Sequence, residues 1–328
     1  MLAKTLVIGA NGFIGSHLVD ALSLDGHEVT AFDRFRSDRA NLFASDARPL
    51  AGDFLSRSDI ERAVSGQDYV FHFLSTTTPA TAENDPTFDL RTNVAQTVEL
   101  LEACVAASVK HFYFASTGGA IYGSQGQSQY FETDRALPIS PYGIGKLTIE
   151  NYLSYFKAKH GLHSTIFRIS NPYGGRQRAN RKQGLIPIAL RQIALGEPVV
   201  RLGDGQMVRD YIYVDDLVSM IARVVGKSPE HTVYNLGSGH GHTVAEVLES
   251  LHRVTGKDFD IVEQPKPPTF VDRVVLDTSR YVGEFGPHDL TPLDEGISRT
   301  YGDILEQLRR ELDAAANNYK LSSVRQPH

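Results

Sequence analysis

A glycine-rich turn between an apolar strand and an apolar helix constrains the fold of this chain more than any other feature. Residues 5–8 read Thr-Leu-Val-Ile, a short apolar run typical of a strand buried on both faces. Residues 9–15 follow as Gly-Ala-Asn-Gly-Phe-Ile-Gly, and apolar side chains then recur at helical spacing through Leu22. Such glycines let the backbone approach a phosphate at a helix N-terminus. The pattern predicts a dinucleotide-binding unit, with an ordinary βα turn as the alternative.

The next strand, residues 28–32, ends in Asp33, where a carboxylate can read the sugar of a bound nucleotide. It can accept hydrogen bonds from both adenosine ribose hydroxyls, and it would repel a 2′-phosphate. We therefore expect NAD rather than NADP. NADP is favoured instead by three nearby arginines, Arg34, Arg36 and Arg39, because a guanidinium could bind such a phosphate.

Four further apolar runs alternate with helical patterns, and they predict an α/β protein with a parallel, doubly wound sheet of the Rossmann type. Residues 85–107 read as one long helix, and His72 and Cys104 read as packed core residues. Ligands bind at the carboxyl edge of such sheets, so polar residues that end the strands are candidate contacts. The four apolar runs and the polar residues that follow them are 49–51 before Asp53, 68–74 before the loop Ser75–Thr78, 111–116 before Thr117, and 164–169 before Asn171.

The patterns become shorter and looser after about residue 175, which predicts two lobes. We expect residues 1–175 to form the NAD-binding Rossmann domain, with strands and helices from about 210–240 returning to it. Residues 176–316 should form mainly a smaller α/β substrate-binding lobe, whose last helix spans 293–312. The polar segment 317–328 is expected to be a frayed tail.

Tyr142 and Lys146 form the candidate catalytic pair. Their i, i+4 spacing places them on one face of a helix that Pro141 suits as a first residue. A free tyrosine has a pKa of about 10, and a nearby fixed positive charge favours its phenolate. Taken alone, the pair could also be two surface side chains without chemistry. Ser116 and Thr117 end the strand that precedes this helix, so we expect their hydroxyls at the same edge of the sheet.

Charge and cysteine content exclude several classes of partner. The formal net charge of −6 gives no reason to expect a nucleic-acid partner. Cys104 is the single cysteine, so we expect no internal disulfide and no metal site. The apolar runs are too short to cross a bilayer, and a strand that begins near Lys4 leaves no room for a signal peptide. We therefore expect a cytoplasmic protein with no membrane partner.

Taken in order, the motifs resemble those of the extended short-chain dehydrogenase/reductases, in particular the NAD-dependent nucleotide-sugar epimerase/dehydratase group. The resemblance covers nearly the whole chain, and the ordered set is far more specific than any one motif. The matching segments are the turn 9–15, Asp33, Asp53, Asn93, Ser116–Thr117, Tyr142 with Lys146, 171–174 (Asn-Pro-Tyr-Gly), 203–216 (Gly-Asp-Gly to Val-Asp-Asp) and 234–239 (Tyr-Asn-Leu-Gly-Ser-Gly).

The resemblance implies a role for each matching residue. Tyr142 acts as the base, Lys146 supports it by charge and holds the nicotinamide ribose, and Asn93 bridges to that lysine. Thr117 or Ser116 is the catalytic hydroxyl. The implied NAD contacts are Gly9, Asn11, Gly12, Phe13, Ile14, Gly15, Asp33, Arg34, Asp53, Phe54, Phe73, Leu74, Ser75, Asn93, Tyr142 and Lys146. The implied contacts to a UDP-sugar are Thr117, Tyr142, Asn171, Arg209 and Asp272.

Gly118 and Gly119 narrow the reaction. Dehydratases of the family carry an Asp-Glu pair directly after the catalytic hydroxyl, and decarboxylating members usually carry a Glu there. The glycines offer no acid or base at that place. The resemblance then implies a 4-epimerase that inverts a UDP-hexose, an N-acetylhexosamine or a hexuronate through a transient 4-keto sugar. A nucleotide-sugar reductase, an epimerase at another carbon and a non-catalytic NAD-binding regulatory protein are the alternatives.

Four places depart from the family pattern, and one is the loop Ser75–Thr78, which is richer in hydroxyls than the commoner Ala-Ala form. The loop after the fifth strand is one residue longer than in the shorter pattern, which favours Thr117 over Ser116 without excluding Ser116. The arginine often found before Asp272 is missing, so its nucleotide contact is absent or comes from Arg273. The aliphatic residues 274–276 would leave room for an N-acetyl or carboxylate group on the sugar.

The resemblance also implies an oligomeric state. The long helices that begin near Asp85 and Tyr142 resemble the pair that forms a four-helix bundle between subunits of relatives. We therefore expect a homodimer.

Overall fold

The computed structural model describes residues 3–35, 45–177 and 184–323. Within these ranges a central sheet of seven parallel strands confirms the predicted doubly wound fold. The strand order reverses between β1 and β4, and such a switch point is where open α/β sheets bind nucleotides. In spatial order the strands are β10 (Val233–Leu236), β6 (His163–Ile169), β5 (His111–Thr117), β4 (Tyr69–His72), β1 (Lys4–Ile8), β2 (Glu28–Asp33) and β3 (Arg48–Ala51).

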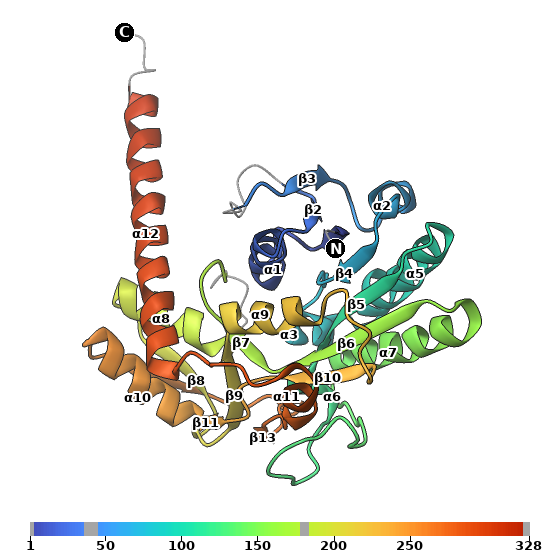
Figure 1. Ribbon diagram of the computed structural model, residues 1–328. Coiled ribbons are helices and arrows are strands. Elements are labelled where there is room, and N and C mark those ends of the chain that lie inside the picture. Colours follow the sequence, from blue (N-terminus) through green and yellow to red (C-terminus); the bar gives the residue numbers. More distant parts are fainter. Residues whose placement is uncertain (1–2, 36–44, 178–183, 324–328) are drawn as a thin grey trace.

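Helices cover both faces of this sheet (Figure 1). Strand β1 shows why both faces are apolar: Val7 belongs to one hydrophobic core, whereas Leu6 and Ile8 belong to the other. The first core contains side chains of α1 (Phe13–Leu24), α9 (Val214–Val224) and α11 (Ser279–Phe285). The second contains side chains of α2 (Arg57–Val64), α5 (Gln96–Ala106) and α7 (Pro141–His160).

The second lobe is built from shorter elements around its own core, which includes Leu190, Leu251 and Ile297. Strand β9 (Val208–Tyr213) pairs with β7 (Asn171–Tyr173), β11 (Gly241–Thr243) and β13 (Arg273–Val274). Strand β8 (Val199–Leu202) pairs with β12 (Ile261–Gln264). The helices of this lobe are α8 (Leu185–Leu195), α10 (Val244–Thr255) and α12 (Leu293–Ser323).

Helix α12 is longer than the sequence predicts. It continues past residue 312 to Ser323, and its C-terminal part stands away from the body of the molecule (Figure 1). The backbone is therefore helical over residues 317–323, where we expected a frayed tail. Residues 324–328 lie outside the described ranges.

The helix predicted over residues 85–107 is interrupted by a π-helical turn. Helix α3 (Pro79–Asn84) comes first, and α4 (Pro86–Asp89), the π-helix η1 (Leu90–Ala95) and α5 then follow without a break. A π turn has one more residue than an α turn, and such turns often lie at functional sites. This one carries Asn93.

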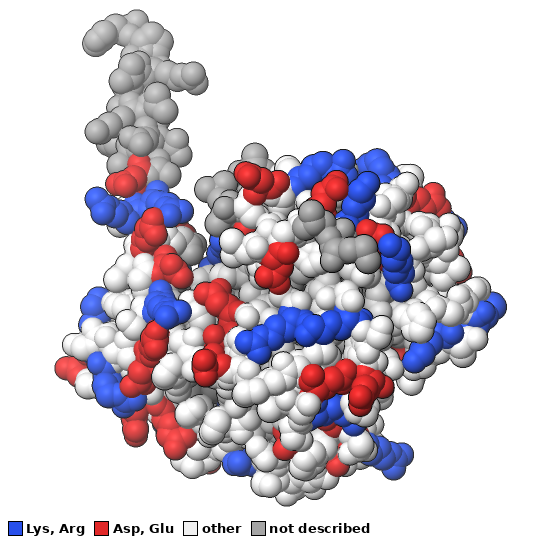
Figure 2. Space-filling model, in the orientation of Figure 1, with Lys and Arg blue, Asp and Glu red and all other residues white. Residues whose placement is uncertain are grey.

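The two predicted core residues are buried. His72 Nε2 lies 2.9 Å from Thr97 Oγ1, and burial lowers the pKa of His72 to about 3, so its ring is neutral. Cys104 is buried as well. In the described part of the chain, no helix is long and apolar enough to cross a membrane. On the face shown in Figure 2, acidic and basic side chains are interspersed.

Candidate active site

The turn after β1 is a backbone cradle that glycines alone can line. Gly9 has a φ of +88°, and a Cβ on it would lie 2.8 Å from the backbone nitrogen of Leu74. A Cβ on Gly12 would lie 2.9 Å from the Gly9 carbonyl oxygen, and one on Gly15 would overlap that oxygen. Helix α1 begins at Phe13, directly after this turn. The residues present therefore fit a dinucleotide whose phosphates lie at a helix N-terminus.

Asp33, at the end of β2, is joined to the same turn. Its Oδ2 accepts a hydrogen bond from the backbone nitrogen of Asn11 (3.0 Å), and its Oδ1 accepts one from that of Arg34 (2.7 Å). The carboxylate thus lies where the sequence predicts the ribose contact. Arg34 is exposed, whereas Arg36 and Arg39 lie outside the described residues.

The other predicted cofactor contacts follow β3 and β4. Phe73 and Leu74 lie against the glycine turn through their backbone atoms. Asp53 Oδ1 accepts a backbone N–H two residues further along the chain (3.0 Å), and Ser75 Oγ donates to a carbonyl in its own loop (2.8 Å). Phe54 is buried among the residues of the second core, so its ring contributes to packing.

Helix α7 places the candidate catalytic pair at the carboxyl edge of β5. Ser140 caps this helix, because its Oγ accepts a backbone N–H three residues further on (3.2 Å). Lys146 Nζ lies 5.7 Å from the ring centroid of Tyr142 and 4.7 Å from that of Phe114. It donates a hydrogen bond to the carbonyl oxygen of Ala115 (2.8 Å). The ammonium is thus anchored on β5 beside the phenol.

Burial opposes the charged form of both members of the pair in the protein alone. Burial, with a smaller contribution from Asp89, raises the pKa of Tyr142 to about 12. Burial also lowers the pKa of Lys146 to about 8, against the opposing charges of Asp89 and Glu150. Burial disfavours the charged form of each group. Tyr142 is a protonated phenol at neutral pH in the protein alone, and its base form needs further positive charge.

The hydroxyls of Ser116 and Thr117 differ in their surroundings, because neighbouring side chains of a strand point to opposite faces. Ser116 Oγ donates to Glu150 Oε1 (2.5 Å), and the same carboxylate pairs with Arg168 (Oε2 to Nη2, 2.7 Å). Among the residues that the structure describes, none forms a hydrogen bond with the Thr117 hydroxyl. Ser116 therefore supports a buried ion pair, and Thr117 is the hydroxyl available to a ligand.

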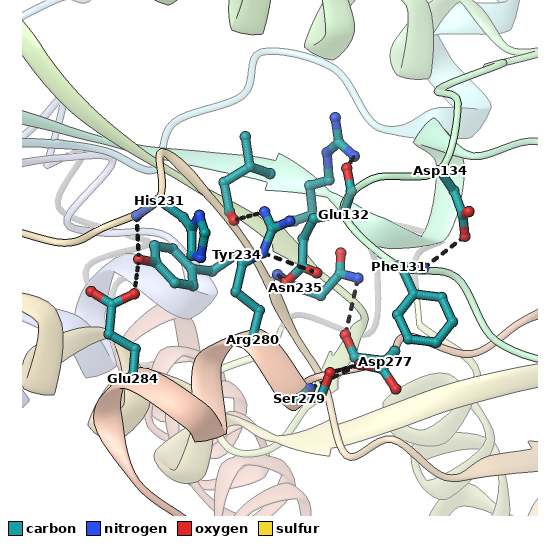
Figure 3. Close-up of polar contacts among 12 residues, drawn as sticks. Phe131, Glu132, Asp134, His231, Tyr234, Asn235, Asp277, Ser279, Arg280 and Glu284 are labelled. Atoms are coloured by element: carbon teal, nitrogen blue, oxygen red, sulfur yellow. Dashed lines mark hydrogen bonds and ion pairs between the residues drawn. The ribbon is translucent and has the colours of Figure 1, made fainter.

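A buried polar network behind β5 was not predicted from the sequence. Arg168 Nη1 contacts the hydroxyl of Tyr122 (3.1 Å), which donates to Asn235 Oδ1 (2.7 Å). The backbone nitrogen of Asn235 donates to Glu132 Oε1 (2.8 Å), and Glu132 Oε2 lies 3.6 Å from Arg280 Nε. Figure 3 shows these last three residues where β10, the loop before α7 and α11 meet. The signal available in sequence was Asn235, which belongs to the motif at 234–239.

Asn93, in η1, holds the loop after β4. Its Oδ1 accepts the backbone N–H of Thr76 (2.9 Å), and its Nδ2 donates to Thr77 Oγ1 and to Asp89 Oδ1 (2.9 Å each). In the described ranges no direct hydrogen bond joins Asn93 to Lys146, so the predicted bridge is not made by contact between the two side chains. Asp89, which the sequence analysis did not single out, is part of this cluster.

Asn171 faces the glycines that follow Thr117. Helix α6 (Gly118–Ile121) begins at these glycines, and a Cβ on Gly119 would lie 3.7 Å from Asn171 Oδ1. A Cβ on Gly118 would overlap the side chain of Leu276. A side chain at Gly118 would therefore require Leu276 to move, whereas a Cβ at Gly119 would make only ordinary contacts.

Arg209 and Asp272 form the outer part of the predicted substrate contacts. Arg209 Nη2 donates to the carbonyl of Val271 (2.7 Å), and its Nη1 donates to that of Val208 (2.8 Å). The carboxylate of Asp272 is exposed and pairs with Lys266, so only its carbonyl contacts the arginine (3.4 Å). Backbone carbonyls thus fix the guanidinium of Arg209, which keeps further N–H donors for a ligand.

Comparison with known proteins identifies relatives that match nearly the whole chain. The model of the family described as NAD dependent epimerase/dehydratase family matches residues 5–237. The UDP-glucose 4-epimerase of Mycolicibacterium smegmatis is 31% identical over 307 residues, which cover 90% of this chain and 97% of that protein. The structure of Thermotoga maritima UDP-glucose 4-epimerase with UDP-glucose has a TM-score of 0.87 at 34% identity and covers 93% of this chain and 99% of its own. The structure of the Thermus thermophilus UDP-glucose 4-epimerase complex with NAD has a TM-score of 0.85 at 31% identity. It covers 92% of this chain and 98% of its own.

Proposed function

This chain belongs to the NAD-dependent epimerase/dehydratase family, and from that premise we propose that it inverts C4 of a UDP-hexose through a transient 4-keto sugar. The observation that carries the proposal is the end of β5. Thr117 has a hydroxyl without an internal hydrogen bond from the described residues, and Tyr142 and Lys146 lie on the helix packed against this strand. Gly118 and Gly119 follow where elimination would need acids. Such a site can move a proton at one sugar carbon, but these two positions offer no acid or base for eliminating water at the adjacent carbons.

The glycine cradle and Asp33 are the residues that would hold NAD. When bound, NAD supplies a reversible acceptor for hydride at the sugar carbon. The proposal of NAD over NADP rests on Asp33, because its carboxylate lies beside the glycine turn and would repel a 2′-phosphate. Nucleotide released by denaturing the purified protein should therefore be NAD, and release of NADP would contradict this assignment.

Three side chains of the protein act at C4. Tyr142 accepts the proton of the C4 hydroxyl and returns it after the sugar has rotated to present its other face. Thr117 donates a hydrogen bond to the C4 oxygen. Lys146 opposes the cost of burying the phenolate, because its ammonium is fixed on β5 through the Ala115 carbonyl (2.8 Å). With the site loaded, the positive charge of the oxidised cofactor adds to that of Lys146.

The diphosphate of the substrate must stay bound while the sugar rotates. Arg209 suits this role because backbone carbonyls orient its guanidinium, and a planar guanidinium can grip a phosphate through two donors. For a further contact to the sugar nucleotide we propose Asn171, which lies beside Gly119.

A panel of UDP-hexoses, UDP-N-acetylhexosamines and UDP-hexuronates, with products identified by NMR, tests the proposal. We expect conversion of one C4 epimer into the other, with no net consumption of NADH. Stoichiometric consumption of NADH would instead support a reductase, and inversion at another carbon would contradict the assignment to C4. The aliphatic residues 274–276 would leave room for the N-acetyl or carboxylate group of the larger sugars in this panel.

We also propose that the protein is a homodimer through α5 and α7. These helices pack side by side and carry a shallow groove of about 430 Å³ that opens to solvent. Tyr152 and Tyr155 line it and are 38% and 47% exposed, which leaves two large rings partly open to solvent on one face. A second copy of the same helix pair would cover them. A cytoplasmic location, expected from the single cysteine, stays a prediction.

A further inference from the structure

A buried carboxylate to which the proposed mechanism gives no role lies against the catalytic helix. Asp89, the last residue of α4, is 2% exposed. Its Oδ1 accepts hydrogen bonds from Thr77 Oγ1 and from Asn93 Nδ2. Over the described ranges no hydrogen bond reaches its Oδ2. Because the residue is buried, nearby positive charge would stabilise the carboxylate oxygen that makes no hydrogen bond.

Oδ2 approaches α7 through a gap that Gly145 leaves open. A Cβ built on Gly145 would lie 2.7 Å from Asp89 Oδ2, which is closer than a carbon and an oxygen can pack. Gly145 lies inside the helix, so space rather than backbone conformation explains why a glycine is needed. It also lies on the turn of α7 that joins Tyr142 to Lys146. The glycine thus lets an anion from another helix reach the catalytic turn.

We infer that Asp89 is the electrostatic partner of the Tyr142–Lys146 pair, a positioning residue that keeps the buried ammonium charged and sets the pH range in which the phenol can act as base. The inference rests on the proposed function, because it concerns the same catalytic pair.

The other titratable groups around the pair are already paired or neutral, so Asp89 is the candidate for this role. Three titratable side chains lie near Lys146: Glu150 on the same helix, His72 on β4 and Asp89 on α4. Glu150 is already paired with Arg168 (2.7 Å) and bound by Ser116, and burial keeps His72 neutral. Among the described residues, Asp89 is therefore the facing anion for which no ion pair with a cation is formed.

The sign of the effect is the same for both members of the pair. The negative charge of Asp89 raises the pKa of Tyr142 and that of Lys146. Without it, the phenolate forms at lower pH and the ammonium is lost at lower pH. The proposed mechanism needs the phenolate and the ammonium together, so each limb of the rate profile follows one of these two pKa values. Both limbs should move to lower pH.

Asp89→Asn tests this, because it keeps an oxygen that can accept from Thr77 and Asn93 but removes the charge. Two quantities are measured: the pH profile of kcat/KM for epimerisation, and an NMR titration of the protein with 13C-labelled lysine, with the Lys146 signal assigned by Lys146→Met. In the unmutated protein the Lys146 titration should have its midpoint at about 8. In Asp89→Asn the midpoint should be lower, and both limbs of the rate profile should move with it. Asp89→Glu, which keeps the charge, should retain a higher midpoint than Asp89→Asn.

Two further variants separate charge from structure. Thr77→Val removes a hydrogen bond to Asp89 but leaves the carboxylate, so the Lys146 midpoint should stay closer to that of the unmutated protein. Gly145→Ala keeps Asp89 but fills the space that Oδ2 approaches, so it should lower the midpoint even if Asp89→Asn does not fold. A Lys146 midpoint unchanged in Asp89→Asn and Gly145→Ala, or a loss of rate without movement of either limb, would show that Asp89 is only structural.

The NMR titration does not depend on the substrate, so the two proposals can fail separately. A lowered Lys146 midpoint in a protein that converts no UDP-sugar would contradict the proposed function and leave the inference standing. If the protein epimerises a UDP-sugar but its Lys146 midpoint is the same with and without the Asp89 charge, the inference is contradicted and the proposed function stands.

Discussion

Tyr142 must lose a proton in a place where burial holds that proton tightly, since its pKa is raised to about 12. In Tyr142→Phe the ring still fills the site, but no group is left to accept the C4 proton. We expect turnover to fall by about 10²–10⁴-fold while bound NAD is retained. Product formation followed by NMR measures the first quantity, and nucleotide released on denaturation measures the second. Undiminished epimerisation would refute the assignment of the base.

Ser116 and Thr117 should respond to mutation in opposite ways, although they are neighbours. Thr117→Val removes the hydroxyl available to substrate, so kcat should fall by about 10²-fold or more with little change in stability. Ser116→Ala removes a hydrogen bond to the buried Glu150 carboxylate, so the free energy of unfolding should fall by about 1.5–3 kcal/mol. Kinetics and urea unfolding on both variants provide the check. The reverse pattern would make Ser116 the catalytic hydroxyl.

At the scale of single elements, the turn between β1 and α1 depends on a close approach of backbone atoms. A Cβ on Gly15 would overlap the Gly9 carbonyl oxygen, so Gly15→Ala should distort the cradle, weaken NAD binding and destabilise the protein. Gly283, inside α11, is a matched control because a Cβ there meets nothing within 4 Å. Gly283→Ala should leave NAD binding unchanged and stabilise the helix by up to about 1 kcal/mol. Calorimetric NAD binding and thermal unfolding compare the two, and equal effects would contradict the cradle.

The elements predicted correctly from sequence are those whose signal is local. The glycine turn, the apolar strands and the helix capped at Ser140 each show their pattern within a few residues. The π turn of η1 was missed, because one additional residue in a helical turn leaves no periodic signal. Glu150 and Asp89 were missed as well, because their roles come from contacts with Ser116 and Gly145, which lie far from them in the chain. The effect of burial on the pKa of Tyr142 could not be predicted, because the sequence does not show which side chains surround it.

For the molecule as a whole, the exposed rings on α7 argue for a second subunit. The unmutated protein should have the mass of a dimer by light scattering, and Tyr155→Glu should shift it toward the monomer, because a carboxylate would be buried in the contact. Leu24, at the end of α1, is also an exposed apolar residue, and Leu24→Glu should leave the mass unchanged. A monomeric mass for the unmutated protein would refute the predicted dimer.

The pairing of β10 with β6 has a consequence for how the chain can fold as it is made. β6 ends at Ile169, but its outer neighbour comes from residues 233–236, after much of the second lobe has been translated. A nascent chain that has emerged only as far as residue 175 therefore carries an apolar β6 whose outer edge is unpaired, and such edges invite association with other chains. The ribosome must deliver part of the second lobe before the first can close. Shielding by a chaperone would matter most during that interval.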